Sequence, residues 1–342
     1  MEVDIPPIDI PPNEIPINKI DLSSIDTIPS KREIIATIYL PVSNIDDDQA
    51  IVIGATNGNL EIVDLLIQKG VDIHNNNDEV LRKSSEKGHI QVVKLLLENG
   101  ADLSANDNEA LRMSAANGHF DVVQLLVEKG ANVKAKNNSA LIDSVRNGHL
   151  NVVEFLLKNG ADLHAENDNP LYMAALKGHY DIVEFLVKKG ANIRADKYIS
   201  LRISAYKGHM KIFKFLVKMG ADYSVNDEEI FRNAIKKCDI ELVKYLLDLD
   251  VNVNVLNDEP LRIAATIGNL EIVKLLLDWC ANIHARGDYS LYWAMKNGHI
   301  DVAKLLIFRG ADTDILSDEQ MELLGIQRKK SPENLSEMEN YN

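Results

Sequence analysis

Apolar residues along the chain follow two spacings, a helical one within short segments and a 30-residue one between segments. The segment from Leu111 to Asn117 ends at Gly118, and the segment from His119 to Lys129 ends at Gly130. Apolar residues of the second segment have helical spacing: Phe120, Val123, Leu126 and Val127. This pattern predicts two antiparallel helices, each stopped by a left-handed glycine, followed by about ten loop residues.

The same unit returns at a fixed period of 30 residues without an insertion. A glycine ends the first helix of eight units, at Gly58, Gly88, Gly118, Gly148, Gly178, Gly208, Gly268 and Gly298. Another ends the second helix of seven units, at Gly70, Gly100, Gly130, Gly160, Gly190, Gly220 and Gly310. An apolar residue leads each unit, at Ile51, Leu81, Leu111, Leu141, Leu171, Leu201, Phe231, Leu261 and Leu291. We therefore predict nine repeats in residues 47–316 and one all-α solenoid of stacked antiparallel helix pairs.

Short polar residues precede the first helix of most repeats. Three positions before the leading apolar residue, six repeats have Asp or Asn: Asp78, Asn108, Asn138, Asp168, Asp258 and Asp288. Such side chains can accept hydrogen bonds from free N–H groups at a helix start, so we predict N-caps here. Small pairs within the same helices, such as Ser114-Ala115 and Ala174-Ala175, permit the close helix approach that stacking requires.

The residues from Leu171 to His179, L-Y-M-A-A-L-K-G-H, resemble part of an ankyrin repeat. Phe185-Leu186 and the exit Gly190-Ala191-Asn192 add to the resemblance, which extends over residues 47–316. The T-P-L-H opening of that family is absent, and the period is 30 rather than about 33 residues, so its β-hairpin fingers should be short here. Uniform arrays of this period, rich in Asn, Ile and Lys, resemble those encoded by giant DNA viruses of amoebae (mimivirus-like).

Two flanks border the predicted array. Residues 1–46 contain seven of the ten prolines, so we expect an extended or disordered segment before about Ser30. Residues 33–40 loosely echo a second helix and are predicted to form a degenerate cap on the first repeat. In the flank at residues 317–342, Glu319 to Leu324 is predicted to form a capping helix, followed by a polar, disordered tail.

The formal charge of −15 comes mostly from the ends of the chain. Residues 1–46 and residues 311–342 each hold 8 acidic and 3 basic side chains, and the array between them holds the remaining 36 acidic and 31 basic ones. The overall acidity argues against nucleic acid or an anionic membrane as a partner. The nearly balanced array still permits an acidic protein partner.

Cysteine content and hydropathy bear on the compartment. Two cysteines in 342 residues fit a reducing environment, and no apolar run approaches the roughly 20 residues of a membrane span. The acidic start Met1-Glu2-Val3-Asp4 followed by Pro6-Pro7 does not resemble a signal peptide. We expect an intracellular, cytoplasmic monomer, in a host cell if the chain is viral.

Histidine is the most conspicuous candidate for chemistry. Six histidines follow the turn glycine directly: His89, His119, His149, His179, His209 and His299. A metal site needs imidazoles within about 2.1 Å of one ion, whereas stacked helix pairs lie roughly 8–10 Å apart, so we predict a structural role. Cys238 and Cys280 lie at opposite ends of a helix pair, too far apart for a disulfide. The common nucleotide and zinc motifs are absent, so we expect a non-enzymatic protein with no catalytic, metal or cofactor-binding residues.

Charged residues also recur at helical positions. Arginines follow the leading apolar residue at Arg82, Arg112, Arg202, Arg232 and Arg262, and glutamates precede them by three residues at Glu79, Glu109, Glu229 and Glu259. This spacing predicts ion pairs along each helix. The seventh repeat departs from the pattern, since Cys238-Asp239 replaces Gly-His and Asp250 replaces a glycine. We expect this repeat to be locally weak, because a left-handed non-glycine residue costs about 1 kcal/mol.

Two variable positions at the end of the first helix are the candidate binding site. The resemblance implies that this helix lines a concave surface where partner proteins bind. There we predict a basic, aromatic-containing patch for an acidic partner segment, drawn from Arg146, Lys177, Tyr206, Lys207, Lys236 and Lys237. The alternative is an ordinary solvated face.

We accordingly predict a non-enzymatic scaffold that binds a partner protein on its concave repeat surface. A second hypothesis is an adaptor that recruits targets to a ubiquitin-ligase complex through its N-terminal flank. That hypothesis depends on a faint F-box-like similarity between Ile28 and Leu40.

Overall fold

The structure of the chain is a computed structural model that describes residues 46–327. The predicted cap at residues 33–40, the F-box-like segment and the tail after residue 327 lie outside the described residues. Within the described range the chain forms nineteen α-helices and one short 3₁₀ helix, with no β-strand. The predicted all-α solenoid is confirmed.

Eighteen of these helices form nine consecutive pairs, which we number as repeats one to nine. The first helices of the pairs are α2 (Asp47–Thr56), α4 (Asn75–Lys87), α6 (Ala105–Ala116), α8 (Ala135–Asn147), α10 (Ala165–Lys177), α12 (Ala195–Lys207), α14 (Val225–Lys236), α16 (Val255–Ile267) and α18 (Tyr289–Lys296). The second helices are α3 (Leu60–Gln68), α5 (Ile90–Glu98), α7 (Phe120–Glu128), α9 (Leu150–Lys158), α11 (Tyr180–Lys188), α13 (Met210–Lys218), α15 (Ile240–Asp248), α17 (Leu270–Asp278) and α19 (Ile300–Phe308).

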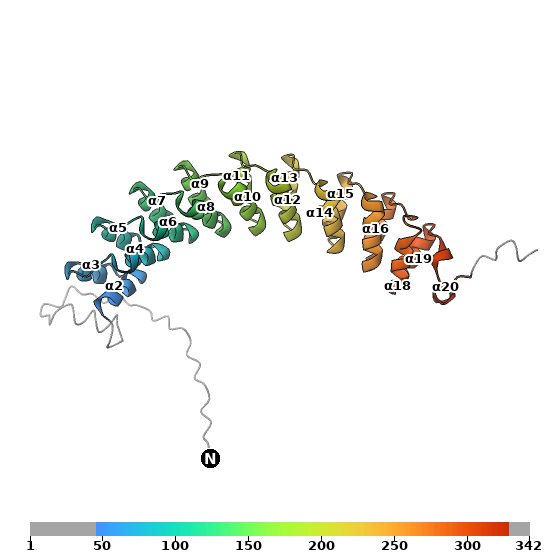
Figure 1. The fold of residues 1–342 in the computed structure, drawn as a ribbon, viewed down its shortest axis with the longest axis horizontal. Helices are drawn as coiled ribbons and strands as arrows, with labels where there is room; N and C mark the ends of the chain where they lie inside the picture. Colours follow the sequence, from blue (N-terminus) through green and yellow to red (C-terminus); the bar gives the residue numbers. More distant parts are fainter. Residues whose placement is uncertain (1–45, 328–342) are drawn as a thin grey trace, which may run out of the picture.

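The pairs stack side by side into an arc, with the first helices along its concave edge and the second helices along its convex edge (Figure 1). One continuous core runs through the array, because the leading apolar residues, the alanines and serines beside them and the apolar faces of the second helices are all buried. Figure 1 therefore supports the prediction that the first helix lines the concave surface. We call the first helices inner and the second helices outer.

A left-handed turn stands where each β-hairpin finger was expected. In repeats two to eight, three consecutive residues near the start of the inner helix have positive φ, as in Asn76, Asn77 and Asp78 at 52°, 57° and 54°; in repeat nine the three residues directly precede α18. Continuous right-handed geometry in α4 therefore starts only at Glu79. Most of these residues are Asn or Asp, which tolerate this region better than other side chains do, whereas Leu256 occupies it at φ 52°.

The predicted N-caps are wrong, because the capping residues lie inside this turn and bond to another loop. The Asp78 carboxylate accepts a hydrogen bond of 2.8 Å from the backbone N–H of Asp102, 24 residues further along the chain. Equivalent bonds join Asn108 to Asn132, Asn138 to Asp162, Asp168 to Asn192, Glu228 to Asn252, Asp258 to Asn282 and Asp288 to Asp312. These acceptors are at most 8% exposed, so each one fixes a loop to the entrance of the preceding inner helix.

The histidine column joins neighbouring repeats. Each Nε2 donates to a backbone carbonyl near the end of the preceding inner helix at 2.9–3.3 Å, in the pairs His89–Thr56, His119–Glu86, His149–Ala116, His179–Arg146, His209–Leu176 and His299–Thr266. The ring also fills the space beside the preceding turn glycine. A Cβ placed on Gly118 would lie 2.5 Å from Nδ1 of His149. Glycine is therefore required there both for its positive φ and for the ring of the following repeat.

The seventh repeat shows that the glycine and the histidine depend on each other. Cys238 replaces the turn glycine and has a φ of 57°. In the following repeat, Asn269 replaces the histidine whose ring would otherwise contact this position. The residue 31 positions after Gly208 is Asp239 rather than His. A Cβ placed on Gly208 would therefore meet no atom within 4 Å. Both replacements instead cap their own outer helices, by accepting the backbone N–H groups of Leu242 and Ile272.

Arginine and glutamate pair between repeats rather than along one helix, which corrects the prediction. Arg82 bonds Glu109 at 2.9 Å, and the same pairing joins Arg202 to Glu229 and Arg232 to Glu259. Arg82 also donates to the backbone carbonyls of Asn76 and Asn77 in the left-handed turn. Arg232 makes the same two kinds of contact, so Arg82 and Arg232 each hold the turn of their own repeat and the inner helix of the next.

A short helix closes the described end of the array. Helix α20 (Asp318–Leu324) begins with a capping box between Ser317 and Gln320, and it buries Met321 and Leu324 against the last repeat. It follows a 3₁₀ turn, η2 (Thr313–Ile315). The predicted helix from Glu319 to Leu324 is confirmed, one residue longer at its start.

Candidate partner-binding surface

On the inner helices of repeats five to nine, five positions per helix stay accessible. In repeats five to nine these positions define what we call the concave strip: Asn169, Tyr172, Met173, Leu176, Lys177, Ile199, Arg202, Ile203, Tyr206, Lys207, Glu229, Arg232, Asn233, Lys236, Lys237, Glu259, Arg262, Ile263, Thr266, Ile267, Tyr289, Tyr292, Trp293, Lys296 and Asn297. None of them is buried.

The concave strip is basic although the chain is acidic. It contains eight Lys or Arg and only two carboxylates, Glu229 and Glu259, each of which is paired with an arginine. A hydrogen bond from Arg202 holds the pKa of Glu229 below its usual value, so this carboxylate stays ionised. The same five positions in repeats one to four carry five basic and four acidic residues. Positive charge is therefore concentrated in the second half of the array.

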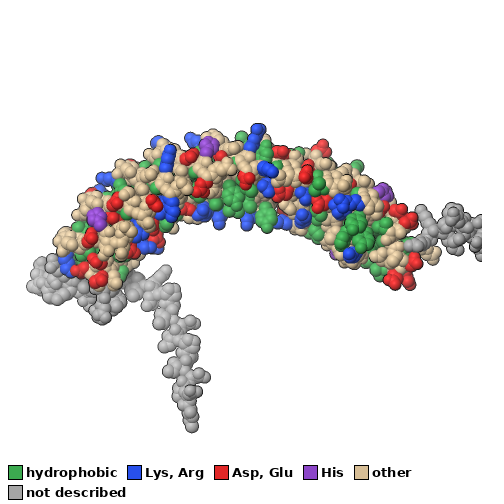
Figure 2. Space-filling model, in the orientation of Figure 1, with side chains coloured by type: hydrophobic (Ala, Val, Ile, Leu, Met, Phe, Trp, Pro, Cys, Tyr) green, Lys and Arg blue, Asp and Glu red, His purple; other side chains and the backbone are tan. Residues whose placement is uncertain are grey.

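Apolar and aromatic side chains lie between these charges. Figure 2 shows hydrophobic side chains along the concave edge near the middle of the array, with Lys and Arg beside them. Tyr206 is 55% exposed and is the most exposed aromatic residue of the strip. A surface that combines basic groups with exposed aromatic and aliphatic groups has the composition of protein-binding sites, where aromatic residues and Arg are enriched.

The predicted patch residues are distributed over four repeats. Lys177, Lys207, Lys236 and Lys237 are exposed at the ends of their inner helices. Arg146 lies in repeat four, outside the strip, where it forms an ion pair with Asp143 of its own helix. The structure therefore brings together the residues of repeats six and seven, with Lys177 one repeat away and Arg146 two.

Tyr206 is the centre of the patch. The Nζ of Lys237 lies 3.3 Å from the centroid of the Tyr206 ring and donates a hydrogen bond to the Tyr206 carbonyl oxygen. Lys207 also approaches the ring, with its Nζ 5.9 Å from the centroid. Two cations beside one exposed ring form a platform that favours a carboxylate next to an apolar group.

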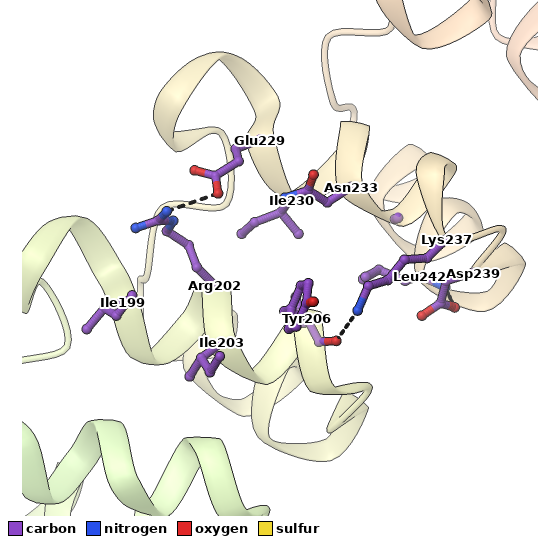
Figure 3. Close-up of a pocket in the computed structure, with 12 residues that line it drawn as sticks. Ile199, Arg202, Ile203, Tyr206, Glu229, Ile230, Asn233, Lys237, Asp239 and Leu242 are labelled. Carbon is purple, nitrogen blue, oxygen red and sulfur yellow. Dashed lines mark hydrogen bonds and ion pairs between the residues drawn. The ribbon is translucent and has the colours of Figure 1, made fainter. Parts of the chain in front are cut away.

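A cavity of about 150 Å³ opens beside this platform, between α12 and α14 (Figure 3). Its apolar wall comes from Ile199 and Ile203 of α12, Ile230 of α14, and Leu242. Arg202 and Glu229 form one polar edge, while Tyr206, Asn233, Lys237 and Asp239 form the rest of the opening. A dry cavity of this volume can hold a small hydrocarbon group.

The cavity has a local cause in the sequence. Position 213 is Phe where seven other repeats have Val, and the leading residue of repeat seven is Phe231 where seven others have Leu. Both rings are fully buried at this junction and are the largest such side chains in the described core. This extra volume separates α12 from α14, which contact each other less closely than other neighbouring inner helices do.

The same junction also lacks two of the regular links between repeats. Asp239 replaces the histidine that would donate to the preceding inner helix. Tyr198 replaces the buried Asp or Asn, and among the described residues no hydrogen bond joins it to the backbone N–H of Asp222. The ion pair between Arg202 and Glu229 remains. Besides apolar contacts, repeats six and seven are therefore joined by this pair, by the Lys237 hydrogen bond to the Tyr206 carbonyl and by the ion pair between Lys214 and Glu241.

Sequence reasoning missed a second aromatic group at the far end of the strip. On α18 the rings of Tyr289 and Tyr292 stack at a centroid distance of 5.3 Å, and Trp293 meets both edge to face. Lys296 lies 4.6 Å from the Trp293 ring centroid. In the 30-residue period Tyr292 and Trp293 are equivalent to Arg202 and Ile203. This equivalence was the sequence signal that places the aromatic group on the same face as the patch.

The residues considered for metal and redox chemistry do not converge. Among residues 46–327 no group of three or more His, Cys, Asp or Glu side chains could hold a metal ion. Cys238 is partly buried and Cys280 is exposed, and both are free thiols. In the part of the chain that the structure describes, no helix is long and apolar enough to span a bilayer.

Comparison with protein families decides the classification. The family model described as ankyrin repeats (3 copies) matches residues 32–107, 104–167, 162–227 and 231–317. The chain belongs to the ankyrin-repeat family. The matches cover most of the chain, and the ankyrin fold accounts for the paired helices and the concave inner surface. No curated protein matches the chain.

Proposed function

We propose that this ankyrin-repeat protein is a noncatalytic scaffold that holds an acidic segment of a partner protein on its concave strip. One observation carries the proposal: eight basic side chains, only two carboxylates and several exposed aromatic rings share the accessible face of five consecutive inner helices. Ankyrin repeats generally mediate protein–protein interaction. Successive repeats add contacts along one extended partner, so affinity accumulates without a cofactor.

We place the centre of the binding site at the patch around Tyr206. Lys207 and Lys237 lie beside the exposed ring, and Lys237 also lines the cavity. Lys236 adds positive charge at the end of α14. We assign the bound carboxylates to these lysines and the apolar contact to the cavity. Lys177 belongs to the same surface, whereas Arg146 is a peripheral contact because it is already paired.

Charge reversal with a matched control tests the proposal. The full chain carrying Lys207→Glu and Lys237→Glu is compared with a variant carrying Lys94→Glu and Lys274→Glu, which changes the charge equally on the outer helices α5 and α17. Proteins captured from the native cell are quantified for both variants and the wild type. We expect the first variant to lose its captured partner at least about tenfold and the second to retain it. Equal capture by all three proteins would refute binding of the partner at the concave strip.

The adaptor hypothesis and the cellular setting remain predictions from the sequence. The segment from Ile28 to Leu40 lies outside the described residues, and deletion of residues 1–46 would test it by separating loss of a ligase from loss of a target. The division into segments 1–46, 47–316 and 317–342, the monomeric state, the intracellular location and the viral origin stand on sequence arguments alone.

A further inference from the structure

The concave strip is complementary in charge to another part of the same chain. Residues 4–17 read D-I-P-P-I-D-I-P-P-N-E-I-P-I, with three carboxylates and no basic residue. The motif of an acidic residue followed by Ile and Pro occurs three times at a spacing of five residues, starting at Asp4, Asp9 and Glu14. Each copy supplies one carboxylate for the lysines and one branched apolar side chain for the cavity.

The lengths of the segment and of the strip agree. The polyproline II conformation rises about 3.1 Å per residue, so fourteen residues bound in that conformation would span roughly 43 Å. Five inner helices at a spacing of about 8–10 Å span roughly 32–40 Å from first to last. The segment can therefore contact the whole strip without folding back.

The connecting chain is long enough to place the segment there. Residues 18–46 join it to α2 in repeat one, and 29 residues at about 3.1 Å each reach roughly 90 Å. The distance from repeat one to repeat five is four helix spacings, or about 40 Å. Because the segment is tethered, its effective concentration at the strip is in the millimolar range.

Proline content favours binding. A segment whose φ angles are already restricted loses less conformational entropy when it is fixed on a surface. The cavity of about 150 Å³ between Ile203 and Ile230 is large enough for the side chain of an isoleucine, and Lys237 at its opening lies where the preceding carboxylate would be.

We propose that residues 4–17 of the chain bind its own concave strip, with an isoleucine in the cavity between α12 and α14 and the carboxylates on Lys207 and Lys237. An outside partner then has to displace this segment. The inference rests on the proposed function to the extent that both use the strip for an acidic segment. It adds a defined occupant and a form of self-regulation.

The first experiment locates the segment in the full chain. A photo-crosslinking amino acid replaces Ile8, and the crosslinked residues are mapped by mass spectrometry. We expect monomeric products joined to α10, α12 or α14, which decrease at least fivefold when Lys207→Glu and Lys237→Glu are also present. The control pair Lys94→Glu and Lys274→Glu should leave them unchanged. Crosslinks spread evenly over the array, or crosslinked dimers in place of monomers, would overturn binding within one chain.

The second experiment measures the competition. A fluorescent peptide of residues 4–17 is titrated against the full chain and against a full chain whose own segment carries Asp4→Asn, Asp9→Asn and Glu14→Gln. We expect the second protein to bind the peptide about tenfold more tightly, because its tethered competitor is weakened. Circular dichroism confirms that the repeats are intact in both proteins.

The outcomes separate this inference from the proposed function. Equal, lysine-dependent binding of the peptide to both proteins would refute self-occupation and leave the strip as a site for acidic segments. No binding to either protein would refute the assigned occupant, while capture of an outside partner is still tested by the lysine reversals above. Loss of capture together with absent peptide binding would refute both.

Discussion

The contact between the turn glycine and the histidine of the next repeat leads to a quantitative prediction. Gly118 and Gly208 have nearly the same backbone, with φ of 74° and 75°. A Cβ on Gly118 would lie 2.5 Å from His149, whereas a Cβ on Gly208 would meet nothing within 4 Å. Replacing each glycine by alanine therefore separates the backbone effect from the effect of the ring.

The expected magnitudes follow from these two environments. Alanine in left-handed geometry costs about 1 kcal/mol, and both variants lose this amount. In Gly118→Ala the ring must also move, which breaks the hydrogen bond from His149 to the Ala116 carbonyl, for a further loss of about 0.5–1.5 kcal/mol. Crowding in a packed region adds about 1–3 kcal/mol. The two variants should therefore differ by about 1.5–4.5 kcal/mol in free energy of unfolding.

Urea unfolding followed by circular dichroism measures the difference, and hydrogen exchange at the two turns localises it. A third protein, with Gly118→Ala and His149→Asn together, reproduces the natural combination of Cys238 with Asn269. It should be more stable than Gly118→Ala alone, although His149 is lost. Equal destabilisation by Gly118→Ala and Gly208→Ala, or no recovery in the double variant, would refute a steric interlock between repeats.

Four further predictions concern stability. Burial raises the pKa of Glu228, so its ionised form destabilises the folded protein at pH 7. Glu228→Gln should therefore raise the urea midpoint of unfolding at pH 7. This gain should disappear as the pH falls through the raised pKa to below about 4.5, where the carboxyl is protonated in both states. Glu229→Gln should behave in the opposite way, with a loss at pH 7 that disappears only as pH falls through its lowered pKa, because that carboxylate is stabilised by Arg202. Asn138→Ala should lower the free energy of unfolding by about 1–3 kcal/mol in the same urea assay, because it leaves the backbone N–H of Asp162 without its acceptor. An unchanged free energy of unfolding would show that water replaces the Asn138 side chain as the acceptor. Residues 231–255 should exchange amide hydrogens faster than repeats three to five, and uniform protection along the array would contradict a weak seventh repeat.

The repeat period predicted the fold because it fixes which residues are equivalent. Leading leucines and turn glycines could be assigned from spacing, and the structure confirms them. Contacts between repeats were harder to assign, and the arginine column shows why. In a strict 30-residue period, Glu79 lies three residues before Arg82 and Glu109 lies 27 residues after it, so one pattern describes both pairings. Only the three-dimensional stacking chooses the second.

The candidate site was predictable in part for the same reason. Register located Lys177, Tyr206, Lys207, Lys236 and Lys237 at equivalent positions, and the structure leaves all five exposed at the ends of their inner helices. The cavity could not be predicted, because it depends on how the added volume of two phenylalanines is distributed between packed helices. The aromatic group on α18 was not predicted, because Tyr289 and Tyr292 occupy columns that were assigned to structural ion pairs of Glu and Arg in other repeats.

The pairing of turn residue and ring limits how this gene can gain or lose units. Excising 30 residues around the seventh unit, such as 222–251, would bring Gly208 before Asn269, a harmless junction. Excising residues 252–281 instead would place Cys238 31 positions before His299, where its side chain would collide with the imidazole. The units are thus not freely interchangeable modules. Each one is compatible only with certain predecessors, and recombination within the array is restricted accordingly.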